Sequence, residues 1–75
     1  MVMTAEEIRK AQRRSPFKPF TICLSDQRQF SVPHPDFLWL IPGGRTLVVA
    51  DQQGAADWID LIHVTSLKVE GTDDV

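Results

Sequence analysis

Short apolar stretches, each bounded by turn-forming residues, occupy most of the chain after residue 19. In FTICLSDQRQFSV (20–32), apolar and polar residues alternate on both sides of Asp26-Gln27. This pattern predicts two half-buried strands joined by a tight turn. FLWLI (37–41) and TLVVAD (46–51) are apolar runs separated by the turn sequence PGGR. A continuously apolar strand such as FLWLI is expected to be covered on both faces or to lie at a subunit contact.

The last apolar run, WIDLIHVTSLKVE (58–70), differs because its apolar residues fall into two phases. They follow one alternation up to Leu61 and another from Ile62 onward. A change of phase within one run predicts a bulge or a single helical turn around residues 60–63. The region from about residue 19 to residue 70 therefore predicts about five short antiparallel strands.

One helix is predicted before the strands, at about residues 4–14. Thr4 is a suitable N-cap, and Glu7 stands three residues later, which completes a capping box. The apolar stripe of this helix is thin, so we expect it to lie against a sheet or barrel. Ser15-Pro16 ends it. One helix followed by short strands and tight turns indicates a mainly β (α+β) chain, folded as a small SH3-like or Sm-like barrel.

The chain is short enough to form one domain, residues 1–75, with an acidic tail at 71–75. A domain of this size buries only roughly 60% of the surface of its unfolded chain, so it has one small core. A single cysteine allows neither an intramolecular disulfide nor a cysteine zinc cluster. No stretch resembles a secretory signal or a membrane span, so we expect a bacterial-type cytoplasmic protein without membrane contact.

The charges are unevenly distributed, although the net charge is only −2. Five of the eight basic residues fall within ten positions: Arg9, Lys10, Arg13, Arg14 and Lys18. Cations on two helical turns are able to meet phosphates. They also suit the C-terminal end of a helix, where the dipole favours positive charge. A general nucleic-acid binder carries a clear positive excess, which this chain lacks, so we prefer the second interpretation.

His34 stands between two prolines in VPHPDF (32–37) and is followed by Asp36. A metal or catalytic site would combine these two residues with His63, brought close by folding. Alternatively, the prolines hold the segment extended, and His34 lies in a stiff connector between strands or contacts a partner. We prefer the connector, because no supporting set of ligands or nucleophile can be assembled around this histidine.

Asp60 and His63 are three residues apart, so one helical turn would place them on the same face. An imidazole oriented by an acid is the arrangement of a general base. A nucleophile for that base to activate is missing from the sequence pattern. We therefore prefer the interpretation in which Asp60 caps the turn and His63 lies at the rim of the barrel.

Trp39 and Trp58 are the remaining candidates for a functional surface. Tryptophan is enriched at binding hot spots, although a small core also needs large rings. Because FLWLI is apolar throughout, one face of its strand is expected to meet another subunit. Self-association would also stabilise a domain of this size.

The series PFKPFTICLSDQRQFSVPHPDF (16–37), followed by DLIHVTSLKVE (60–70), resembles a family of short uncharacterised bacterial proteins. That family typically has a strand ending in Asp-Gly-Arg, a His-Pro-acid segment and a closing Asp-Leu-x-His-Val-Thr. Gln27 stands here where the glycine is usual. The resemblance implies no particular activity.

In architecture the chain is also similar to the Sm-like fold, including the bacterial Sm-like RNA chaperone. In that family a Lys-His-x-Ile-Ser segment enters the last strand and helps to form an RNA pocket in a ring. His63 and Ser66 match the histidine and serine of this segment, whereas Ile62 stands in place of the lysine.

Together these patterns predict a non-catalytic module for protein interaction or self-assembly, without a cofactor or a metal. The alternative is an RNA- or DNA-binding Sm-like ring that uses the basic helix and the region of His63. The candidate contact residues for a partner or a nucleic acid are Arg9, Arg13, Arg14, His34, Trp39 and His63.

Overall fold

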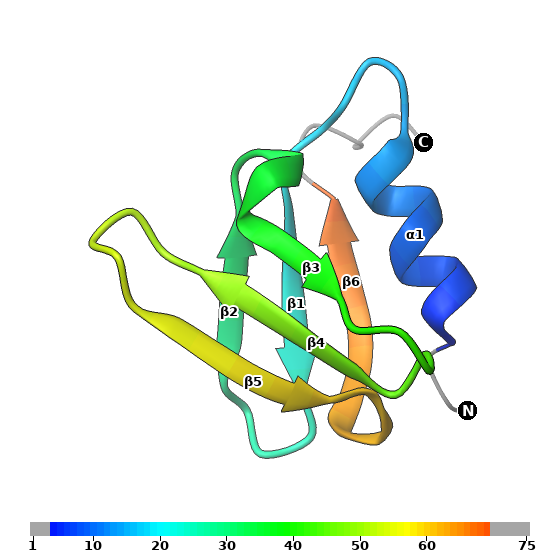
Figure 1. Cartoon of the computed structure of the whole chain (residues 1–75), viewed down its shortest axis with the longest axis vertical. Coiled ribbons are helices and arrows are strands. Elements are labelled where there is room, and N and C mark those ends of the chain that lie inside the picture. Colours follow the sequence, from blue (N-terminus) through cyan, green and yellow to red (C-terminus); the bar gives the residue numbers. More distant parts are fainter. Residues whose placement is uncertain (1–3, 70–75) are drawn as a thin grey trace.

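The computed structural model describes residues 4–69, which form one α-helix, six strands and two short 3₁₀ helices (Figure 1). The expected acidic tail at 71–75 lies outside the described residues. The elements in chain order are α1 (Ala5–Arg13), β1 (Phe20–Leu24), β2 (Gln29–Val32), η1 (Pro35–Phe37), β3 (Leu38–Leu40), β4 (Thr46–Ala50), β5 (Ala56–Asp60), η2 (Leu61–His63) and β6 (Val64–Val69).

The strands form two three-stranded antiparallel sheets, ordered β2-β1-β6 and β3-β4-β5. In Figure 1 the strands of the second sheet run diagonally across those of the first, and α1 lies along one side of both. The predicted α+β class with antiparallel strands is confirmed. Within residues 4–69 the hydrogen-bonded pairing does not join the two sheets into a closed barrel.

The predicted helical turn around residues 60–63 is observed as η2. It separates two strands that belong to different sheets, so the last apolar run contains the end of β5 and the whole of β6, and the strands number six rather than about five. The N–H of Leu61 donates to the carbonyl of Arg45, and the N–H of Ser25 donates to the carbonyl of His63, both at 2.8 Å. These bonds hold the turn to both sheets, which explains the change of phase in the sequence.

The core lies between the two sheets and under α1. The alternation predicted for residues 20–32 is confirmed, because Phe20, Ile22, Leu24 and Val32 are all buried. Ile8 is the buried residue of α1, in agreement with a thin apolar stripe. The buried cluster consists of Ile8, Phe20, Ile22, Leu24, Val32, Leu38, Leu47, Val49, Ile59, Leu61 and Val64.

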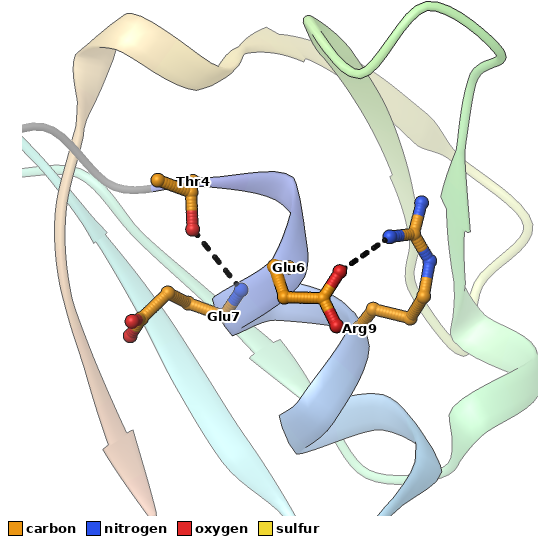
Figure 2. Close-up of polar contacts among 4 residues, drawn as sticks. All are labelled: Thr4, Glu6, Glu7 and Arg9. Atoms are coloured by element: carbon orange, nitrogen blue, oxygen red, sulfur yellow. Dashed lines mark hydrogen bonds and ion pairs between the residues drawn. The ribbon is translucent and has the colours of Figure 1, made fainter.

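The helix begins where the capping signal predicts. The Thr4 hydroxyl accepts a hydrogen bond from the N–H of Glu7 at 3.3 Å, as Figure 2 shows. The helix ends at Arg13, and Arg14 leaves it with φ −59° and ψ 139°.

No helix among residues 4–69 is long and apolar enough to span a membrane.

The predicted turn at Asp26-Gln27 joins β1 to β2. The N–H of Leu24 donates to the carbonyl of Arg28 at 2.9 Å, which leaves three residues in the loop. Gln27 has φ +78°, in the left-handed region that normally favours glycine. Three-residue hairpin loops usually place glycine at this point, where a type I turn is followed by a left-handed residue.

Candidate interaction surface

The outer face of the β3-β4-β5 sheet carries three large apolar side chains in a row. Trp39 on β3 is paired with Val48 on β4, and Val48 is paired with Trp58 on β5. We call these three residues the tryptophan row. Trp39 is 51% exposed and Trp58 is 71% exposed, whereas Val48 between them is only 8% exposed. The row therefore presents two exposed aromatic side chains on opposite sides of one shielded valine.

The position of the tryptophan row follows from strand geometry, because successive side chains of a strand point to opposite faces of the sheet. Leu38 on β3, Leu47 on β4 and Ile59 on β5 point into the core and are buried. Their neighbours in sequence must point to the opposite face of the sheet. The expectation that FLWLI is covered on both faces is therefore wrong within residues 4–69, because its inner face is buried and its outer face carries exposed Trp39. The alternative of a subunit contact at this strand stays a prediction.

The outer face of the other sheet has the opposite character. Its cross-strand pairs are Thr21 with Ser31 and Lys68, and Cys23 with Gln29 and Ser66. An antiparallel sheet with one face in water normally carries polar residues there. The β2-β1-β6 sheet follows this rule, and the β3-β4-β5 sheet departs from it at the tryptophan row.

The exposed area of the row is energetically important. A whole tryptophan side chain buries up to about 250 Å², so exposed fractions of 51% and 71% correspond to about 300 Å². At about 25 cal/mol per Å², covering this area contributes about 7 kcal/mol before the cost of association. No other part of residues 4–69 exposes two large aromatic residues on one strand-to-strand row.

The basic candidates belong to α1 and its C-cap and not to the strands of this sheet. Arg9 is half-buried, and its Nη1 lies 3.2 Å from Oε1 of Glu6 in an ion pair one helical turn away (Figure 2). Arg13 and Arg14 are exposed at the end of the helix. The start of the helix, not its basic end, lines a cavity with Leu61 and Ile62 of η2.

His34 is exposed, with extended backbone at φ −144° and ψ 154°, directly before η1. Its backbone carbonyl accepts from the N–H of Phe37 at 3.1 Å, and its ring centroid lies 5.9 Å from that of Phe37. Its side chain makes no capping hydrogen bond. Among residues 4–69, no three His, Cys, Asp or Glu side chains form a group that could hold a metal ion. The backbone of this segment is extended, as expected for a connector between strands, and a partner contact by His34 stays a prediction.

Asp60 and His63 flank η2 as the spacing predicts, and both are exposed. The expected cap is not formed, because the side chain of Asp60 makes no capping hydrogen bond to this turn. Within the described part of the chain, no hydrogen bond joins the carboxylate of Asp60 to the imidazole of His63. The two side chains therefore do not form the oriented pair of a general base.

A cavity of about 700 Å³ lies between the start of α1 and the turns that flank β4 and β5. Its charged lining residues are Arg45 and Asp60, both exposed. A second cavity of about 370 Å³ includes Cys23, which is 8% exposed and is a free thiol. Among residues 4–69, no hydrogen bond joins a hydroxyl or thiol of either cavity to a carboxylate or an imidazole.

The sequence identifies Trp58 as a candidate for a functional surface, but its proximity to Trp39 depends on the register of β4, which no local pattern reveals. Gln12 is a residue of structural importance that the sequence patterns do not reveal. It donates through its side-chain amide to the backbone carbonyls of Pro35 and Leu38. No protein-family model, curated protein or solved structure matches the chain.

Proposed function

We propose that this chain is a small non-catalytic module that assembles with copies of itself through the β3-β4-β5 sheet. The observation that carries the proposal is the tryptophan row, with one ring 51% exposed and the other 71% exposed on paired strands. Tryptophan at the centre of an apolar patch is typical of the few residues that dominate binding energy. A second copy supplies an identical apolar surface and needs no opposing charge.

The surroundings of the row favour a protein over a nucleic acid. The other outward positions of β4 and β5 are Thr46, Ala50, Ala56 and Asp60. None of these is a cation, and Asp60 would repel phosphates. A nucleic-acid surface needs Lys or Arg to replace the counterions of the phosphate backbone. This face lacks such groups, although exposed rings are able to stack on bases.

An RNA- or DNA-binding ring is the alternative function. It would use Arg13 and Arg14 together with the region of His63. The start of α1 lies beside η2, and Arg13 ends a helix of nine residues. At about 1.5 Å per residue, the basic end lies about 12 Å along the helix from that contact. This separation favours self-assembly over a single phosphate-binding surface.

We also propose that the two sheets are a divided form of a small SH3-like or Sm-like barrel. The chain passes from one sheet to the other at η1, between β2 and β3, and returns at η2, between β5 and β6. Corners of this kind allow a bent sheet to wrap around one core. Membership of the short bacterial family stays a prediction.

The decisive measurement is the molar mass of the full chain by light scattering over a dilution series. At about 100 μM we expect an oligomer that dissociates when Trp39→Thr and Trp58→Thr are combined, because threonine keeps the strand propensity and removes the rings. Ile62→Ser is the matched control, since Ile62 is 74% exposed but lies in η2, outside the row. Circular dichroism checks that each variant is folded.

Two results would contradict self-assembly. A wild-type chain that stays monomeric at this concentration removes the proposal, as does a double variant that keeps the wild-type mass. Fluorescence anisotropy with mixed-sequence RNA and DNA at low salt tests the alternative. Binding that falls steeply with salt and is lost in Arg13→Ala with Arg14→Ala would support the nucleic-acid function instead.

A further inference from the structure

We infer that two copies of the chain pair through their β5 strands, antiparallel and about a two-fold axis at Trp58, to make one six-stranded sheet. This inference rests on the proposed self-assembly and specifies its geometry. The argument uses the edge that β5 leaves open, the direction of its backbone groups and the side chains that each register brings together.

β5 is the terminal strand of its sheet, and no strand among residues 4–69 pairs with its outer edge. The other terminal strand, β3, has part of its outer edge occupied, because the Gln12 side chain donates to the carbonyl of Leu38 at 2.6 Å. Proteins commonly protect open edges with charged side chains, above all lysine, or with proline. β5 has the sequence ADWID, without lysine or proline, and its charged residues are Asp57 and Asp60. No proline blocks this edge, and the two carboxylates restrict the registers in which a further strand can pair.

The backbone groups that face outward follow from the ladder between β4 and β5. The N–H of Asp51 donates to the carbonyl of Ala55 at 2.9 Å, and the N–H of Leu61 donates to that of Arg45 at 2.8 Å. Hydrogen-bonded and non-hydrogen-bonded pairs alternate along an antiparallel ladder. Between these two bonded ends, the N–H and C=O groups of Ala56, Trp58 and Asp60 must point away from β4.

A two-fold axis permits only a few registers for two β5 strands. When Trp58 faces its symmetry copy, Ala56 faces Asp60, and all three outward-pointing residues of each copy are paired. Moving the axis to Asp57 places two carboxylates directly opposite each other, which is destabilising. Moving it to Ile59 requires Ile62 to pair with Ala56, but Ile62 belongs to η2 and is not extended. The register with the two-fold axis at Trp58 is therefore favoured.

This register also joins the two tryptophan rows. The two Trp58 side chains lie side by side across the axis on the outer face and cover each other in part, whereas Val48 and Trp39 continue the apolar strip on both sides and Trp39 stays exposed. Asp57 of each copy lies opposite Ile59 of the other, so no two carboxylates are directly opposite, and the two copies of Asp57 are diagonal neighbours on the inner face. Aromatic pairs on neighbouring strands stabilise the association beyond their buried area.

Asp60→Pro tests the edge without disturbing the fold. Asp60 has φ −79°, close to the value that proline requires, and its N–H points away from β4. Proline removes this donor from each copy and places a ring against the partner strand. Losing two hydrogen bonds raises the dissociation constant about 30-fold. Asp60→Ala is the matched control, since it removes the carboxylate, keeps the N–H and should leave the dimer intact.

Comparison of two single variants provides a second measurement, independent of whether the proline variant folds. In the edge-paired dimer Trp58 lies at the axis and Trp39 lies at the ends of the strip. Trp58→Thr should therefore weaken the dimer by at least about 10-fold more than Trp39→Thr. Stacking of the two sheets face to face would bury both rings, and the two variants would then be equivalent.

The outcomes separate the inference from the function on which it rests. A monomeric Asp60→Pro chain beside a dimeric Asp60→Ala chain supports edge pairing. A dimeric, folded Asp60→Pro chain overturns it, and so do equal effects of the two tryptophan substitutions. If edge pairing is overturned but the variant that combines Trp39→Thr with Trp58→Thr is monomeric, self-assembly through the tryptophan row is still supported. A monomeric wild-type chain overturns both.

Discussion

The side-chain amide of Gln12 donates a hydrogen bond of 2.6 Å to the backbone carbonyl of Leu38 and one of 2.9 Å to that of Pro35. These bonds attach α1 to the segment that leads from η1 into β3. The segment that resembles a small catalytic motif, VPHPDF, is thus held by the helix on one side and by its own prolines. His34 needs no chemical role to account for its position.

Substitution of Gln12 tests this attachment. Gln12→Glu should lower the free energy of unfolding by about 2 kcal/mol at neutral pH, because a carboxylate cannot donate and would face two carbonyl oxygens in a partly buried site. Gln12→Met, which only removes the donor, should cost about 1 kcal/mol. Urea unfolding measures both. The loss of stability in Gln12→Glu should become smaller at acidic pH, where the protonated carboxyl is able to donate a hydrogen bond. Equal stability of the wild type, Gln12→Glu and Gln12→Met would show that these hydrogen bonds from Gln12 are not important for the fold.

Gln27 is the second position at which a substitution should alter stability. Its φ of +78° is unfavourable for a residue with a Cβ atom. Gln27→Gly should therefore raise the free energy of unfolding by about 0.5–1 kcal/mol, after the larger entropy of the unfolded glycine chain is included. Thermal unfolding gives the measurement, with Gln27→Ala as a control that retains the strain. A glycine variant that is less stable than the alanine variant would contradict the left-handed conformation.

Asp51 organises the loop between β4 and β5. Its carboxylate accepts from the N–H of Gln53 at 2.9 Å and from the N–H of Ala55 at 3.0 Å. Asp51→Ala should lower the free energy of unfolding by about 1–2 kcal/mol, because both donors lose their partner at the start of β5. Asp51→Asn keeps one acceptor oxygen and should lose less than half as much. Chemical unfolding of both variants checks the order.

The pKa of Asp26 should be lower than that of an ordinary aspartate. The backbone N–H of Arg28 donates to its carboxylate at 3.1 Å and is the main cause, and the guanidinium of Arg28 at 2.8 Å adds to it. Since the folded pKa is depressed, the charged form stabilises the fold above the unfolded pKa, and this contribution is lost as pH falls through the folded pKa.

Nuclear magnetic resonance titration of the Asp26 carboxyl provides the test. Arg28→Ala keeps the backbone donor, so it should leave most of the lowering of the pKa in place. If Arg28→Ala returned the pKa to its ordinary value, the guanidinium rather than the backbone would be the cause. Asp26→Asn should approach wild-type stability as the pH is lowered.

Much of the local structure was predictable from sequence. The helix start at Thr4, the strands of residues 20–32 and the turn at 60–63 all depend on neighbours within a few positions, where propensity and periodicity act directly. The cap expected from Asp60 was wrong, because a hydrogen bond of that kind depends on the orientation of a single exposed side chain. The candidate contact residues remain dispersed: Trp39 lies in the row, whereas the arginines, His34 and His63 lie elsewhere.

The sequence by itself determined that this chain forms one helix and short antiparallel strands with tight turns, because these properties arise from backbone geometry and from the alternation of apolar residues. Only the tertiary structure decided that β5 and β6 belong to different sheets and that Val48 stands between Trp39 and Trp58. Register is a relation between segments distant in the chain. It is set by which apolar faces pack together over the whole core, and no local pattern contains that information.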